Sequence, residues 1–462
     1  MPPTTTRHPP CTERLADRLG EGRTGGLAAG GLTEGRADGG AEGLNGGRPA
    51  EGRAEADGLT DRGAARPAAP PPPRLGLYLH VPFCSAICPY CDFAVQTGGP
   101  RRRAEFVDAL LAEIALWRGD AARWQPFDTV YLGGGTPSAL APAELGRILA
   151  AARAGLPVED GAWIALEANP EDVTAASVRQ WRELGVAMLS LGVQSFDAGA
   201  LRFLGRRHTP EQARQAVELA LGAGFATVSI DLIYGEGGEG MAAGAAIERW
   251  RRDLEQAVAL EPQHLSCYQL TIHEGTPFGF RAARGELREL PEAAQAELFR
   301  LTHGFLASQG YAPYEVSSFA RAPEHRSRHN QKYWDHTPYL GLGPSAHSFD
   351  GSRRWWNERK LHAWEAKVAA GEKPVAGGEE LGRRELALEE VMLSLRTAAG
   401  LDLAGFRRRH GFDLAAHNRP LIADLAARGL LAWRGDRLTP SLDGMAVADS
   451  LARGFEVGGT DP

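Results

Sequence analysis

Short apolar runs alternate with longer segments of helical periodicity between Leu75 and about residue 271. The apolar runs predict strands at 75–80, 129–135, 163–169, 186–194, 225–235 and 264–271. The intervening segments predict helices at 101–118, 141–154, 174–184, 208–224 and 243–260. Strands that alternate with helices indicate βαβ units and a parallel sheet, and nearly continuous apolar strands indicate burial on both faces. The pattern therefore predicts an α/β fold that closes into a full or partial barrel, with an open doubly wound sheet as the alternative.

Together with the segments outside this region, the pattern divides the chain into four parts. Residues 1–73 contain 15 Gly and 10 Pro but no Val, Ile, Phe, Tyr or Trp, so we expect a disordered tail or an over-extended start of the reading frame. Residues 74–290 hold the predicted barrel core, and residues 291–373 form an extension. Residues 374–462 contain helical patterns with a short hairpin near 430–439. This last part is typical of a small winged-helix-like α+β module.

Composition narrows the function classes. The chain has 462 residues, a net charge of −7 and five cysteines. The acidic balance gives no support for a nucleic-acid-binding surface, including one on the winged-helix-like module. We find no signal peptide and no apolar run long enough to span a membrane. Few, clustered cysteines suit a reducing compartment, so we expect a cytoplasmic protein.

Three cysteines occur within eight residues, just after the first predicted strand. Cys84, Cys88 and Cys91 follow the spacing Cys-x3-Cys-x2-Cys. A zinc site would need a fourth ligand, for which His80 is available. A four-iron cluster held by only three cysteines would instead keep one iron open to a ligand. We favour the cluster and keep the zinc-bound structural site as an alternative; Cys267, in a predicted strand, is expected to pack in the core.

Other unusual residues follow the ends of the later strands. Gly133–Thr136 follow the second strand, and Glu167, Gln194 and Asp231 lie at the ends of the third, fourth and fifth. Ligand sites of parallel α/β folds form at the carboxyl edge of the sheet. Residues far apart in sequence are therefore expected to converge there.

The motif "CSAICPYC" resembles the radical S-adenosylmethionine (SAM) signature. More narrowly, residues 75–455 look like the oxygen-independent coproporphyrinogen III oxidase family, through "YLHVPFC", "GGGTPS", "EANP", "LGVQSF", "IDLIYG", "YQLT", "HNQKYW" and "YLGLGPSAHSF". The resemblance implies a partial (β/α)6-type radical SAM barrel with a [4Fe–4S] cluster on Cys84, Cys88 and Cys91. In that superfamily the open iron chelates SAM, which one-electron reduction cleaves to a 5′-deoxyadenosyl radical. A low-potential electron donor is thus implied.

The same resemblance implies the residues that bind SAM: Tyr78, Tyr90, Gly134, Gly135, Thr136, Glu167, Gln194, Arg206 and Asp231. In the family's oxidases, positions matching Gln194, Arg206 and Asp231 contact a second SAM molecule. The loop 235–240 departs from the family at Gly237 and Glu239, so we expect a more mobile loop near Asp231. Catalytic residues are not assigned.

Phe93 separates two branches of this family. The oxidases carry a fourth cysteine two residues after the third, where this chain has Phe93. The pattern looks like the haem-chaperone branch, whose members bind haem and are thought to pass it to acceptor proteins. We therefore expect a haem chaperone, with coproporphyrinogen III oxidation as the alternative. Peripheral contact with a membrane is compatible with this prediction. His329 in "HNQKYW" is a candidate haem ligand, although a structural role is its alternative.

Overall fold

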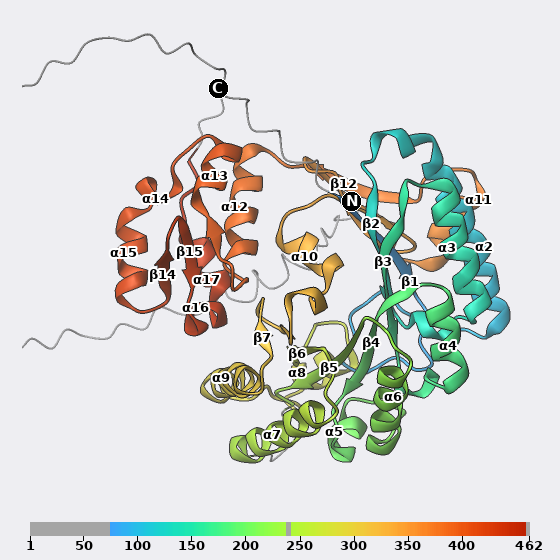
Figure 1. Ribbon diagram of the computed structural model, residues 1–462, viewed down its shortest axis with the longest axis horizontal. Helices are drawn as coiled ribbons and strands as arrows, with labels where there is room; N and C mark the ends of the chain where they lie inside the picture. Colours follow the sequence, from blue (N-terminus) through green and yellow to red (C-terminus); the bar gives the residue numbers. More distant parts are fainter. Residues whose placement is uncertain (1–73, 237–241, 459–462) are drawn as a thin grey trace, which may run out of the picture. The chain divides into compact units, whose positions relative to one another are not determined.

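A parallel six-stranded sheet forms the core of this computed structural model, which describes residues 74–236 and 242–458. The strands are β1 (Leu75–Val81), β2 (Phe127–Gly134), β3 (Val158–Ala168), β4 (Val186–Gln194), β5 (Thr227–Tyr234) and β6 (His264–Gln269), adjacent in chain order. Between them run α2 (Pro100–Trp117), α3 (Pro142–Gly155), α4 (Ala175–Glu183), α5 (Ala198–Phe203), α6 (Pro210–Gly222) and α7 (Ala243–Ala259). The six predicted strands and five predicted helices are confirmed; the short α5 was not predicted. Figure 1 shows the helices arranged along the outside of the curved sheet.

The two faces of this sheet differ in chemistry. The outer face is apolar and packs against the helices, as with Leu79, Leu132 and Ile230, each no more than 1% exposed. Cys267 belongs to the same core, so its predicted packing role is confirmed. The inner face is largely polar: it includes Tyr78, His80, Thr129, Tyr131, Glu167, Ser190, Ser229, Asp231, His264 and Ser266. The inner face is largely buried as well, with Thr129, Ser229 and His264 each no more than 1% exposed, so the expected burial on both faces is confirmed. The inner residues are polar because they alternate with the apolar ones of the outer face.

The sheet extends beyond both ends of the parallel core. Outside β1 it continues through β9 (Tyr339–Leu342), β10 (His347–Phe349), β11 (Arg353–Asn357) and β12 (Val375–Glu380); outside β6 come β8 (Ser318–Ala320) and β7 (Ala312–Pro313). The other helices of this region are α8 (Pro277–Ala283), α9 (Glu292–Ser308), α10 (Arg328–Trp334) and α11 (Leu361–Ala369). No ladder joins β12 to β7 within the described ranges. The strands and their covering helices form the radical-SAM-type α/β architecture of a partial barrel, as expected.

Glu113 on α2 anchors part of the extension to the core. Its side chain is fully buried and accepts hydrogen bonds from Gly343 N (2.7 Å), Asn357 Nδ2 (2.7 Å) and Trp364 Nε1 (3.0 Å). The three donors come from the loop after β9, from β11 and from α11. One carboxylate thus satisfies buried polar groups of three elements that are distant in sequence.

The C-terminal part has the α+β composition that the sequence predicts. It contains α12 (Arg383–Ser394), β13 (Leu401–Asp402), α13 (Leu403–His410), α14 (Leu414–His417), α15 (Arg419–Ala427), β14 (Leu431–Arg434), β15 (Arg437–Pro440), α16 (Leu442–Ala446) and α17 (Ala448–Arg453). The predicted hairpin is β14–β15, paired antiparallel, and β13 completes a three-stranded sheet. A separate cluster of buried apolar residues, including Val391 and Phe406, fills this part.

Local signals explain several helix ends. In α4 and α6, Thr174 and Thr209 accept from the third backbone amide of the helix, which satisfies an otherwise unpaired donor. Pro210 occupies the first turn of α6, as the sequence predicts. Gly411 ends α13 at φ 80°, a conformation that glycine adopts without strain.

Two predictions concern parts of the chain beyond the structure. The tail 1–73 lies outside the described residues, and so do Gly237 and Glu239 of the loop that we expect to be mobile. Within residues 74–236 and 242–458, no helix combines the length and the apolarity needed to cross a bilayer.

Candidate functional site

The three clustered cysteines lie on the loop that follows β1 at the carboxyl edge of the sheet. Cys84, Cys88 and Cys91 are all partly buried and reduced. Burial raises the pKa of the Cys84 thiol, and it raises that of Cys91 to about 11. Such thiols stay protonated at neutral pH unless a metal displaces the proton, as coordination does. Cys84 and Cys91 are thus suited to binding a metal rather than to acting as free nucleophiles.

Two hydrogen-bond donors point at these sulfurs. Thr136 Oγ1 donates to Cys84 Sγ over 3.5 Å, and Arg206 Nη1 donates to Cys88 Sγ over 3.4 Å. The Arg206 guanidinium is only partly exposed and also donates to Asn169 Oδ1 (2.5 Å) and to the Gly192 carbonyl (2.9 Å). Donors and positive charge stabilise anionic sulfur ligands. The surroundings therefore fit thiolates that hold an iron–sulfur cluster.

The geometry disfavours the zinc alternative. His80 Nε2 donates to the Ala94 carbonyl (3.1 Å), and Nδ1 accepts from the Tyr78 hydroxyl (3.1 Å). Burial lowers the pKa of His80 to about 4, so both contacts belong to the neutral ring. In the part of the chain that the structure describes, no three His, Cys, Asp or Glu side chains are close enough to hold a single metal ion. Thiolates of a four-iron cluster bind separate iron atoms and can lie farther apart.

The glycine turn after β2 lies directly against the cysteine loop. Gly134 has φ 109°, and a Cβ there would lie 2.5 Å from the His80 ring. At Gly135 a Cβ would lie 2.8 Å from the Phe83 carbonyl oxygen. Only glycine allows this approach of two backbones. The turn leads straight to Thr136, which contacts Cys84.

We predict that Gly134→Ala destabilises the protein by about 1–3 kcal/mol and distorts the cluster loop, because the variant adds strain and a clash. Urea unfolding and the iron content of the purified protein measure both effects. Gly222→Ala is the matched control: Gly222 is helical and a Cβ there meets no atom within 4 Å. Equal stability of the two variants would contradict the packing argument.

Two partly buried carboxylates, Glu167 and Asp231, lie on the inner face of the sheet. Glu167 accepts from the Tyr131 hydroxyl (2.7 Å) and from Gly134 N (3.1 Å); burial raises its pKa to about 7, with a smaller contribution from Asp231. Asp231 accepts from Ser190 (2.9 Å) and Ser229 (3.3 Å), and burial raises its pKa to about 6. Asp231 lies inside β5 rather than at its end. Both groups suit binding of a cationic or hydroxyl-rich ligand, which would compensate for their desolvation.

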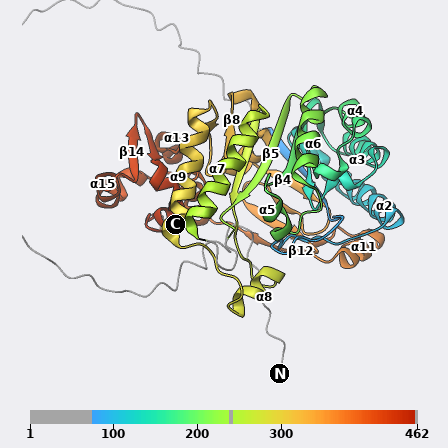
Figure 2. The ribbon, with the colours of Figure 1, turned by 90° about the horizontal axis from the view of Figure 1, so that it is seen from below.

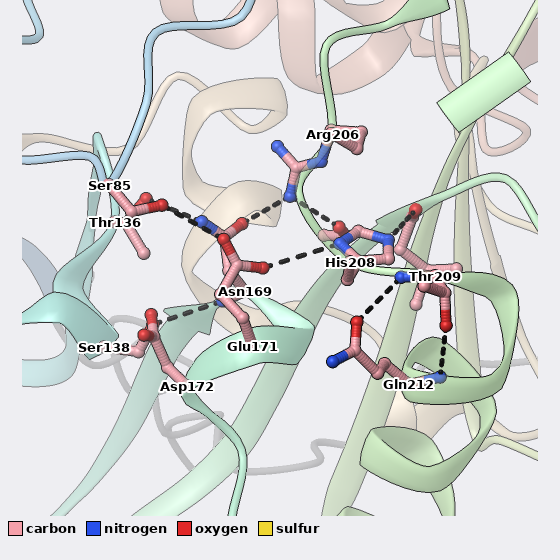
Figure 3. Close-up of polar contacts among 12 residues, drawn as sticks. Ser85, Thr136, Ser138, Asn169, Glu171, Asp172, Arg206, His208, Thr209 and Gln212 are labelled. Carbon is pink, nitrogen blue, oxygen red and sulfur yellow. Dashed lines mark hydrogen bonds and ion pairs between the residues drawn. The ribbon is translucent and has the colours of Figure 1, made fainter. Parts of the chain in front are cut away.

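Asn169 connects several of the predicted residues and was not singled out from the sequence. Its side chain donates to Thr136 Oγ1 (3.1 Å) and accepts from Arg206, as Figure 3 shows. Gln194 lies beside Asn169, because its Nε2 and Asn169 Oδ1 both lie next to Gly192. The backbone of Gln194 has φ 68°. The "EANP" motif that contains Asn169 ends a strand, which was the available signal.

An outer network supports this centre. Ser85 donates to Glu171 (3.1 Å), and His208 lies 3.5 Å from the other oxygen of the same carboxylate (Figure 3). Burial raises the pKa of Glu171, but hydrogen bonds from His208, its own amide and Ser85, together with the charge of Arg206, lower it to about 2. Glu171 is therefore ionised across the physiological range. These residues tie the cysteine loop to the segment after β3 and to the segment before α6, and no sequence pattern marks them.

The remaining predicted residues also face this region. Tyr90 lies beside Cys88 and packs on Phe278 of α8, with ring centroids 6.3 Å apart. Tyr78 stacks on Tyr131 at 6.2 Å. His329 is 1% exposed, and its nitrogens contact Thr129 Oγ1 and the Tyr333 hydroxyl, both at 2.9 Å. This supports the structural role for His329 rather than the haem-ligand role.

Comparisons with known proteins identify the family. Residues 78–243 match the model of the Radical SAM superfamily, and residues 381–447 match that of the HemN C-terminal domain. The protein named "Heme chaperone HemW" from Mycobacterium tuberculosis is 37% identical over 384 residues, which are 82% of this chain and 94% of that protein. Its namesake from Lactococcus lactis is 35% identical, over 82% of this chain and 96% of that protein.

A solved structure supports the fold. Coproporphyrinogen III oxidase (HemN) from Escherichia coli, described as a radical SAM enzyme, superposes with a TM-score of 0.70 at 24% identity, over 84% of this chain and 91% of that chain. At this level of sequence identity the match shows a shared fold and nothing about function. The relatives, the family models and the three-thiol loop agree, and the chain belongs to the HemW family within the radical SAM superfamily.

Proposed function

We propose that this protein is a SAM-binding, [4Fe–4S] haem chaperone that binds haem and passes it to acceptor proteins. The observation that carries the proposal is Phe93, two residues beyond the last of three cysteines, in a chain of the HemW family. The name of the two relatives, heme chaperone HemW, supports the same function.

The proposal assigns the cluster to Cys84, Cys88 and Cys91. Thr136 and Arg206 would donate to the sulfurs, as they do to the thiols. A cluster at this site would offer an open iron to which SAM binds. It would also supply one electron at low potential. Glu167 would accept hydrogen bonds from ribose hydroxyls, and the Gly134–Gly135 turn would bring backbone groups near the ligand. The same proposal gives Tyr78, Tyr90, Gln194 and Asp231 contacts with SAM.

The oxidase alternative is weakened by Phe93, which takes the position of the oxidases' fourth cysteine. Phe93 has no ionisable or hydrogen-bonding atom in its side chain, and its ring is 57% exposed. An exposed aromatic ring favours apolar contact over proton transfer. This favours a carrier role for the site.

Anaerobically reconstituted protein is expected to bind haem and to form no protoporphyrinogen from coproporphyrinogen III, SAM and a reductant. Haem titration by absorbance and chromatographic analysis of the porphyrin products measure the two properties. Phe93→Cys is an informative companion, because it restores the thiol that the oxidases carry. Robust protoporphyrinogen formation by the wild-type protein would refute the chaperone assignment.

The proposal also implies partners and a location. We place the protein in the cytoplasm, with a low-potential electron donor and a haem-accepting protein as its partners. Peripheral membrane contact during transfer is compatible with it, and nucleic acid has no part in it.

A further inference from the structure

We propose that haem docks on the surface formed by Phe93, His273 and Arg359, which meet around Asp92. In this arrangement the Phe93 ring contacts the porphyrin plane, His273 Nε2 faces the iron and Arg359 faces a propionate. The inference rests on the proposed haem-binding function and adds a location to it. All three residues are neighbours of Asp92 on the cysteine loop: Phe93 follows it in the chain, and His273 and Arg359 lie close to it in space.

The apolar contribution comes from the cluster loop itself. Phe93 is 57% exposed, and Ile87 on the same loop is 50% exposed. Large apolar side chains exposed beside a functional site commonly mark a binding surface. A porphyrin is planar and apolar across its face, so covering the Phe93 ring removes apolar area from both partners.

The imidazole contribution comes from the segment after β6. His273 Nδ1 lies 3.8 Å from an Asp92 carboxylate oxygen, and the His273 side chain is 28% exposed. A histidine that binds a metal usually directs its other ring nitrogen to a carboxylate, which fixes the tautomer and the ring orientation. The proposal assigns the ring proton to Nδ1, on the side of Asp92, which leaves the lone pair of Nε2 available to the iron.

This segment is held against the cluster loop. The His273 carbonyl accepts from the Thr276 hydroxyl (2.6 Å), and Phe278 N at the start of α8 donates to the Pro89 carbonyl (2.9 Å). Figure 2 shows α8 apart from the other helices, at the lower edge of the view. The imidazole and the Phe93 ring are therefore presented by two segments that are fastened to each other.

The cationic contribution comes from the segment after β11. Arg359 is exposed, and its Nη2 donates to the Asp92 carbonyl oxygen over 2.6 Å. Among the residues that the structure describes, it forms no ion pair with a carboxylate. Arginine presents several donors in a planar fork, so the remaining N–H groups can bind a propionate. The three side chains thus match three parts of haem: an apolar ring for the porphyrin plane, an imidazole for the iron and a guanidinium for a propionate.

The test is haem titration of anaerobically reconstituted full-length protein, followed by its absorption spectrum. Phe93→Ala is expected to weaken haem binding about tenfold, as loss of a large buried apolar contact does. His273→Ala is expected to shift the Soret band, because the axial ligand changes. Arg359→Ala is expected to weaken binding by a factor of a few, with the spectrum unchanged.

Matched controls guard against adsorption of haem to any exposed aromatic or histidine. Trp433 is 53% exposed on the C-terminal hairpin, and the His417 side chain is 48% exposed; alanine at either is expected to change neither affinity nor spectrum. Iron and sulfide contents confirm that Phe93→Ala retains its cluster. If the wild-type protein binds haem but Phe93→Ala and His273→Ala behave like it, the docking surface is wrong and the chaperone function stands. If the wild-type protein binds no haem, the function itself is wrong.

Discussion

Cys88→Ala is expected to abolish cluster assembly, with iron and sulfide contents falling to background and the broad visible absorbance disappearing. Cys88 supplies one of three thiols, and no other cysteine of the described chain lies near enough to replace it, since Cys267 is buried among apolar residues. The variant also removes the sulfur that Arg206 contacts, which leaves part of a partly buried guanidinium without its acceptor. Metal analysis of protein purified without oxygen is the measurement.

Cys267→Ala is the matched control for Cys88→Ala. Cys267 is 2% exposed on the outer face of β6, so its loss creates a small cavity but leaves the cluster loop unchanged. It should retain full iron and sulfide. Retention of iron by Cys88→Ala would show that Cys88 is not a ligand, and stoichiometric zinc in place of iron would revive the zinc alternative.

Glu113→Ala is expected to lower the free energy of unfolding by roughly 3–5 kcal/mol, the largest stability effect that we predict. The substitution leaves Gly343 N, Asn357 Nδ2 and Trp364 Nε1 without the acceptor that all three share. The Asn357 amide keeps a second contact with the Gly343 carbonyl, which limits the loss. Urea unfolding followed by fluorescence measures the effect.

Glu113→Gln serves as the control, because its side chain does not titrate. The difference in stability between the wild-type protein and this variant is therefore expected to depend on pH. Burial raises the pKa of Glu113 from 4.5 to about 7, so folding favours the protonated carboxyl. Ionisation of Glu113 therefore costs no stability below about pH 4.5. Above pH 7 it lowers the free energy of unfolding by its full amount, roughly 3 kcal/mol. Relative to Glu113→Gln, the wild-type protein should therefore lose stability as pH rises through this window. A pH-independent difference would contradict the assignment.

The parallel core was predictable because each of its elements carries a local signal. Apolar runs mark β1 to β6, and Pro210 with a following helical pattern marks α6. The short strands β7 to β10 have two to four residues and gain their identity from distant partners, so no local pattern reveals them. The polar inner face was missed because isolated residues such as Ser190 and His264 look like interruptions of an apolar run.

The site was predictable where the chemistry is concentrated in one motif. Three spaced cysteines indicate a ligand set by themselves, and the glycine turn indicates close backbone approach. Asn169, Glu171 and His208 become important only through contacts between separate strands. Hydrogen-bond networks of this kind depend on three-dimensional proximity, which composition and spacing do not encode.

The parallel ladder between β1 and β9 has a consequence for protein engineering. Leu77 and Leu79 lie on a strand with neighbours on both sides only because Leu340 and Leu342 pair with it from the extension. A fragment that stops after β6 would leave the cluster-bearing strand with a bare edge, which invites pairing between molecules. Such a fragment should form aggregates even though every cysteine is present, so the smallest soluble radical SAM unit of this chain extends to at least β9.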